Sequence, residues 1–193
     1  MTLAACLARI DEVNRQDPKQ ELDKDGNSIP ACLLYGQRMS AALATFKPDA
    51  SEVLQIAVRA QHIERWHIAR KESPMDRPGY LRWRQELAKH HAELCASIMA
   101  SCGYSEQETE QAKVILRKQQ LKKNPDSQCL EDVACLVFLE YYFADFAKSH
   151  SEDKIISIVQ KTWRKMSEHG QAAALQLPLA EQELSLVQKA LAS

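Results

Sequence analysis

Glycine is scarce in this chain of 193 residues, with only five, and no segment alternates between apolar and polar residues over the length of a strand. The sequence also lacks a Walker loop, a Rossmann glycine fingerprint, a serine-nucleophile motif and zinc-finger spacing. These absences argue against ATP held by a glycine-rich P-loop, and they favour a helical protein over one built on sheets.

Paired cysteines, long apolar runs and excess charge are also missing. The six cysteines form no CxxC pair, so we expect free thiols in a reduced, cytoplasmic setting. No stretch approaches the roughly 18 consecutive apolar residues of a membrane span, and the N-terminus lacks a signal-peptide pattern. The net charge of −1 offers no broad field for nucleic acid. We therefore expect no membrane partner, and the sequence leaves the oligomeric state unknown.

Helical periodicity dominates what is present. The predicted helices cover residues 2–16, 30–46, 49–70, 78–101, 105–120, 126–147, 151–168 and 179–192. Proline-containing turns such as Asp17-Pro18 and Asn124-Pro125 separate them, and Ser105 with Glu108 forms a predicted capping box. The sequence therefore predicts an all-α, single-domain bundle over residues 1–193, with about seven or eight helices.

Three side chains that can bind metals fall on apolar helix stripes: His62, His91 and Asp132. Burying one such group alone costs a few kcal/mol, so three inward-facing groups suggest a common partner. A divalent metal (Mn, Zn, Ni or Fe) with an open coordination position would suit two imidazoles and a carboxylate. Two alternatives stay open, because His90 adjoins His91 and could replace it, and each histidine could instead be a hydrogen-bonded structural residue.

Other charged residues near these positions complete a predicted site. Arginine matches phosphate oxygens with its planar fork, and the predicted substrate-binding residues are Arg59, Arg65, Arg84 and Lys118. Glu131 or, as second choice, Glu93 would be the general base that assists an attacking water. Glu131 also has a structural explanation, because acidic residues favour the first turn of a helix.

A second basic stretch runs from Lys113 to Lys123. It has no aromatic residues between its basic ones, so a solvated helix face is favoured over an RNA-binding patch. Nucleic acid is therefore not the expected partner.

The order His62, His91, Asp132 resembles that of the HD-domain metal-dependent phosphohydrolases. That resemblance implies an all-helical, HD-like fold and cleavage of phosphate esters, often of nucleotides. Ala92 follows His91 where that superfamily has the aspartate of its His-Asp doublet. If His90 takes the histidine place, His91 stands where the aspartate belongs.

A closer resemblance covers nearly the whole chain. The strings Arg59–Trp66, Pro74–Arg84, Leu130–Glu140 and Lys161–Ser167 are similar to the uncharacterised family called domain of unknown function 4202. This resemblance implies membership but no established activity.

The sequence is compatible with two functional hypotheses. The first is a metal-dependent phosphohydrolase that acts on a nucleotide or another small phosphorylated metabolite, with metal-activated water as the nucleophile. The second is a non-catalytic helical binding module with a degenerate HD-like site, in which His62, His91 and Asp132 hydrogen-bond one another. The missing doublet aspartate favours the second.

Overall fold

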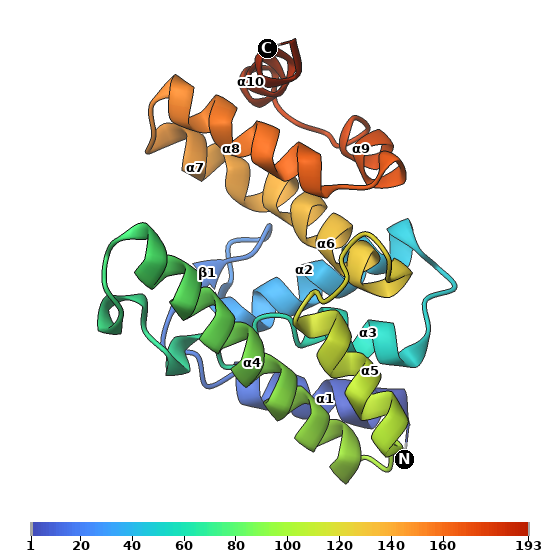
Figure 1. Ribbon diagram of the computed structural model, residues 1–193. Coiled ribbons are helices and arrows are strands. Elements are labelled where there is room, and N and C mark those ends of the chain that lie inside the picture. The colour runs from blue at the N-terminus through green and yellow to red at the C-terminus, as the bar shows by residue number, and fades with distance from the viewer. Residues whose placement is uncertain (1, 193) are drawn as a thin grey trace. The chain divides into compact units, whose positions relative to one another are not determined.

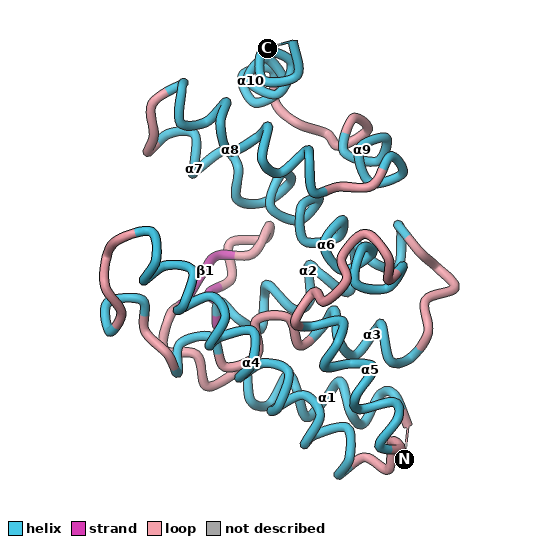
Figure 2. Tube along the Cα trace, viewed as in Figure 1, coloured by secondary structure: helices cyan, strands magenta, loops and turns pink. Residues whose placement is uncertain are grey.

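The computed structural model describes residues 2–192, which are helical apart from turns and one two-stranded hairpin (Figures 1 and 2). The all-α prediction is confirmed, whereas the HD-like architecture stays a prediction. Two compact units make up the chain, one ending at Gln120 and the other beginning at Leu121. The single-domain prediction stays a prediction. No helix within residues 2–192 has the length and apolar character needed to cross a bilayer.

The first unit holds five helices, two short 3-10 turns and the hairpin among its described residues. In chain order they are α1 (Leu3–Asn14), β1 (Gln20–Leu22), β2 (Ser28–Pro30), α2 (Ala31–Phe46), α3 (Glu52–Arg59), η1 (Arg65–His67), η2 (Arg70–Glu72), α4 (Arg77–Ser101) and α5 (Glu106–Leu116).

Helix α3 is the central element of this unit. It packs against α1, α2 and α5, and its residues Val53, Leu54, Ile56, Ala57 and Val58 are all buried. The helix ends at Arg59, so the predicted helix 49–70 is wrong beyond that residue. The apolar periodicity continues into a stretch that is not an α-helix.

Side chains from other elements hold the backbone that follows α3. The buried Asn14 accepts a hydrogen bond from the Glu64 N–H at 3.1 Å, and Glu64 has a left-handed φ of 52°. The Trp83 indole Nε1 donates to the Ile68 carbonyl at 2.9 Å. Because these tertiary contacts satisfy backbone groups that a helix would otherwise pair internally, the chain can leave the helical path here.

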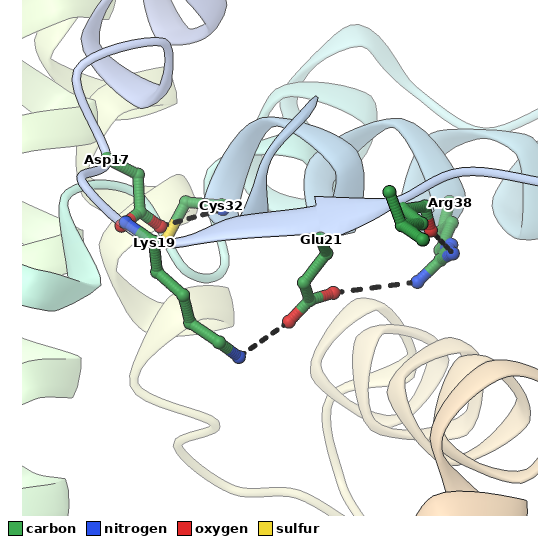
Figure 3. Close-up of polar contacts among 6 residues, drawn as sticks. Asp17, Lys19, Glu21, Cys32 and Arg38 are labelled. Atoms are coloured by element: carbon green, nitrogen blue, oxygen red, sulfur yellow. Dashed lines mark hydrogen bonds and ion pairs between the residues drawn. The ribbon is translucent and has the colours of Figure 1, made fainter. Parts of the chain in front are cut away.

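Asp17 caps α2 from outside the helix. Pro30 stands at the N-cap position, and a proline side chain cannot accept a hydrogen bond. The Asp17 carboxylate instead accepts from the Cys32 N–H and from the Lys19 N–H, both at 2.9 Å (Figure 3). This buried acidic side chain therefore joins the start of α2 to the chain before the hairpin.

The sequence does not predict the hairpin. Strands β1 and β2 pair antiparallel, with Glu21 opposite Ile29. Glu21 also lies 2.7 Å from the Lys19 ammonium and 3.8 Å from the Arg38 guanidinium on α2 (Figure 3). Strands of three residues are too short to show a recognisable alternation in sequence.

The second unit is helical throughout, apart from its turns. Its elements are α6 (Pro125–Val137), the π-helical turn η3 (Phe138–Tyr142), α7 (Phe143–Lys148), α8 (Glu152–Lys165), α9 (Glu168–Ala174) and α10 (Glu181–Ala192). The predicted helix 126–147 is thus interrupted by a π turn. The predicted helix 151–168 ends earlier than expected, at Lys165, and a separate helix begins at Glu168.

Candidate functional site

A cavity of about 280 Å³ opens in the first unit beside α4. Its walls come from the segment after α3, from the first half of α4 and from the end of α5. The polar and charged lining residues are Gln61, His62, Arg65, Arg84, Gln85, His91, Arg117 and Lys118. The same cavity thus collects five residues that the sequence predicted for a site: His62, Arg65, Arg84, His91 and Lys118.

His91 lies at the buried end of this cavity. Only 4% of its surface is exposed, and neither Nδ1 nor Nε2 has a hydrogen-bond partner among the described residues. Burial lowers the pKa of His91 to about 3, and the charges of Arg65 and His90 act in the same direction. The nearby Ile63 backbone acts in the opposite direction and raises the pKa, but it forms no hydrogen bond with the His91 ring. The ring is therefore neutral at pH 7, with one donor and one acceptor to offer.

His62 forms the neighbouring part of the wall. Its ring stacks on Tyr35 with centroids 3.9 Å apart, and it lies 6.2 Å from the His91 ring. Burial lowers the pKa of His62 well below its usual value, and the charges of Arg65 and Lys118 lower it further. This imidazole is also neutral at pH 7.

The unsatisfied nitrogens of His91 give a testable expectation. A buried polar group without a partner costs about 1–3 kcal/mol, so His91→Leu should raise the free energy of unfolding by about 1 kcal/mol. The unfolded chain binds a proton at this position below pH 6.5, whereas folded His91 binds one only near pH 3. The free energy of unfolding should therefore decrease as the pH falls from about 6.5 to 3. This decrease should be smaller in His91→Leu, which has no group to protonate at this position. Urea unfolding at several pH values measures both effects.

The matched control is His90→Leu, one position away on α4. His90 Nε2 lies 2.8 Å from Glu64 Oε2, and its ring stacks on His67 with centroids 4.8 Å apart. Removing a partnered imidazole should not stabilise the fold. A loss of stability in His91→Leu would contradict the assignment of His91 as an unsatisfied group.

Arg65 and Arg84 are supported by aromatic faces. The Arg65 guanidinium lies 5.0 Å from the Trp83 ring centroid, and that of Arg84 lies 5.9 Å from the Tyr80 ring centroid. Arg70 lies 5.8 Å from each of these rings. No carboxylate within residues 2–192 forms an ion pair with Arg65 or Arg84. A stacked guanidinium keeps its N–H edge available for an anion.

Lys118 lines the cavity just beyond the end of α5. Its φ of 52° lies in the left-handed region, and its N–H donates to the Ile115 carbonyl at 2.9 Å. Such a position usually carries glycine, because a side chain there is strained. Arg117, the preceding residue, forms an ion pair with Glu93.

Two predicted site residues of the first unit are engaged in ion pairs. Both oxygens of Asp11 accept from Arg59, from Nε at 2.7 Å and from Nη2 at 2.6 Å. Glu93 pairs with Arg117 and also lies 3.2 Å from Lys113. Neither Arg59 nor Glu93 lines the cavity. The basic stretch that starts at Lys113 is therefore partly neutralised, and its solvated face stays a prediction.

Asp132 and Glu131 belong to the second unit. Asp132 is 1% exposed, and its Oδ1 accepts from the Ser167 N–H at 2.8 Å and from Gln128 Nε2 at 3.0 Å. Its Oδ2 accepts from the Ser167 hydroxyl at 2.6 Å. Glu131 is buried and lies 3.5 Å from the Lys165 ammonium. The structure thus gives Asp132 a clear role within its own unit, where it fixes the start of α9.

A metal centre needs several suitable ligands close together. Across residues 2–192, no three His, Cys, Asp or Glu side chains are arranged to hold an ion. The predicted ligand set His62, His91 and Asp132, with a divalent metal, therefore stays a prediction.

Two neutral residues of the cavity wall, Gln61 and Gln85, were missed by the sequence analysis. Gln61 is buried, and its Oε1 accepts a hydrogen bond from the Tyr35 hydroxyl at 2.8 Å. That bond turns the amide so that its Nε2 is left as a donor. The position beside His62 was the available signal, but an isolated glutamine carries no chemical pattern of its own.

The family model described as Domain of unknown function (DUF4202) matches residues 4–187. Neither the curated proteins nor the solved structures include a match. Because the family match spans nearly the whole chain, this protein belongs to the DUF4202 family.

Proposed function

We propose that the first unit binds a small phosphorylated molecule in the cavity beside α4. One observation carries the proposal. Two guanidinium groups without a carboxylate partner, and an imidazole without a hydrogen-bond partner, line the same cavity within the described part of the chain. Arg65 is half-buried and His91 is buried, and such polar groups are costly unless a partner satisfies them, whereas Arg84 is exposed. An anion with several acceptor oxygens would pair with both guanidinium groups, with the buried His91 in the wall beside them.

The chemistry of the wall favours phosphate. None of the described residues that line the cavity is acidic, and the cationic ones come from η1, from α4 and from the end of α5. Arginine side chains bind tetrahedral oxyanions through paired N–H groups. The volume of about 280 Å³ is at the lower end of the range for ligand sites and suits a small molecule.

The test is direct binding to the full chain. Phenyl phosphate is titrated calorimetrically, and the melting temperature is followed with the same ligand. A ligand that binds only the native state raises the melting temperature as its concentration exceeds Kd. Neither heat of binding nor a rise in melting temperature at saturating phenyl phosphate would refute the proposal.

Hydrolysis of a phosphate ester is the second candidate, and the pair of neutral imidazoles favours it. His62 and His91 have their ring centroids 6.2 Å apart, and both nitrogens of His91 lack partners among the described residues, so both rings suit a divalent metal such as Mn, Zn, Ni or Fe. A bound metal of this kind supplies hydroxide at neutral pH. Asp132 as a third ligand and Glu131 or Glu93 as general base belong to this candidate.

This candidate predicts metal in protein purified without a polyhistidine tag. Elemental analysis should find at least one divalent ion per chain, and adding Mn, Zn, Ni or Fe to stripped protein should raise its melting temperature. Both effects should be absent from His91→Leu. Release of phenol from phenyl phosphate would report the reaction itself. Binding of phenyl phosphate without metal or phenol release would favour the non-catalytic binding module.

A further inference from the structure

We infer that the cavity selects a terminal phosphate in its dianionic form, so that it accepts phosphate monoesters and rejects both diesters and singly charged analogues of the same shape. This selectivity rests on the proposed binding of a phosphorylated molecule, and it specifies which phosphates are bound and in which charge state.

The charges at the wall favour a dianion. Arg65 and Arg84 bring two positive charges that no described carboxylate neutralises, and Lys118 lines the same cavity. The remaining cation, Arg117, is paired with Glu93. A dianion compensates both arginines, whereas a singly charged ligand leaves one guanidinium without a counter-charge. Arg65 is half-buried and partly desolvated, so a ligand whose charge compensates both arginines should be favoured.

The shape of the cavity favours a monoester. Its inner end is made by buried residues, with His91 4%, Leu87 2% and Leu116 4% exposed. Its outer part is made by exposed residues of α4, including Leu81 at 49%. A terminal phosphate held by Arg65 and Arg84 can direct its single substituent outward. A diester has a second substituent, which would have to fit among Leu87, Leu116 and His91.

The pH dependence of binding should come from the phosphate. Besides the arginines and Lys118, the ionisable side chains in the cavity wall are His62 and His91. The ionisable groups that face the wall residues are His90 with its partner Glu64, Cys32 and Tyr35 at Arg65, Tyr80 at Arg84, and Glu93 at Arg117. Burial holds the pKa of both wall histidines below the usual range, so they stay neutral. Arginines keep their charge throughout. Compared with the side chains that line the cavity, the group that changes charge between about pH 5 and 8 is then the phosphate itself, whose second pKa is about 6.

Three probes of matched size separate charge from shape: phenyl phosphate, phenyl sulfate and methyl phenyl phosphate. Phenyl sulfate has the same tetrahedral terminal group but a single charge, and methyl phenyl phosphate is a singly charged diester. On the full chain at about pH 7.5, where the monoester is a dianion, we expect phenyl phosphate to bind at least about tenfold more tightly than either of the other probes. Its affinity should also fall about tenfold per pH unit below about pH 6, while the weak affinity for phenyl sulfate stays flat.

The outcomes separate the two proposals. Equal affinity for phenyl phosphate and phenyl sulfate, or a flat pH profile for phenyl phosphate, would overturn dianion selectivity and leave phosphate binding intact. Tight binding of the diester would overturn the closed inner end. No binding of any probe would refute the proposed function, and the selectivity with it.

Discussion

Asp132→Ala is expected to lower the free energy of unfolding of the full chain by about 3–5 kcal/mol. The buried carboxylate accepts three hydrogen bonds, two from Ser167 and one from Gln128. A hydrogen bond to a charged group contributes about 1.5–3 kcal/mol, and alanine leaves the donors without acceptors in a buried place. Gly170 packs directly against the Asp132 carboxylate, because a Cβ at position 170 would lie 2.6 Å from Asp132 Oδ1. Urea unfolding followed by circular dichroism measures the change.

Asp145→Ala is the matched control in the same unit. The Asp145 side chain is exposed and pairs with the equally exposed Lys148, so its removal should change stability by no more than about 0.5 kcal/mol. The comparison also decides between two roles of Asp132. If Asp132 is a structural acceptor, Asp132→Ala lowers the free energy of unfolding whether or not metal is present. If Asp132→Ala retains full stability in stripped protein and loses only the metal-induced rise in melting temperature, the structural role is wrong and the predicted metal-ligand role is supported.

Helices could be predicted from the sequence where their buried residues form a single apolar face. Leu87, His91 and Cys95 are spaced by four residues on α4, and all three are buried, as the apolar stripe predicts. The long α4 has clear sequence boundaries in Asp76-Arg77-Pro78 and Gly103, and its observed ends agree with them. Local signals were sufficient here because packing and capping favour the same structure.

His62 lines the cavity for a different reason than its sequence pattern suggests. The apolar periodicity places His62 on a helical stripe that continues from Leu54 and Val58, but α3 ends at Arg59 and His62 lies in the turn that follows. It reaches the cavity because Asn14 and Trp83 hold the segment after α3 in place. Those contacts join residues distant in sequence, so no local pattern could reveal them.

Arginine roles were the least predictable part. Arg59 and Arg65 stand equally far from His62 in sequence, yet Arg59 is bound by Asp11 and Arg65 lines the cavity over Trp83. The difference depends on a carboxylate on α1, far away in the chain. The charge of a residue is visible in a sequence, but the partner that neutralises it is a property of the fold.

Arg84→Met should weaken binding of phenyl phosphate by about 10- to 100-fold. One charge-assisted interaction of about 1.5–3 kcal/mol is lost, and about 1.4 kcal/mol corresponds to a factor of ten in Kd. Methionine keeps much of the apolar length of the side chain, while the guanidinium and its contact with the Tyr80 ring are removed. Calorimetric titration of the full chain gives the Kd, and the melting temperature without ligand shows that the variant is folded.

Two further variants make the result specific to the cavity. Arg82→Met removes the same charge two residues away on an exposed part of α4 that does not line the cavity, so its Kd should remain within about twofold of the original. Arg84→Lys keeps the charge but loses the planar fork, so its affinity should fall between those of the original chain and Arg84→Met. If Arg82→Met and Arg84→Met weaken binding equally, phosphate is attracted by the general charge of α4. The cavity then has no specific role.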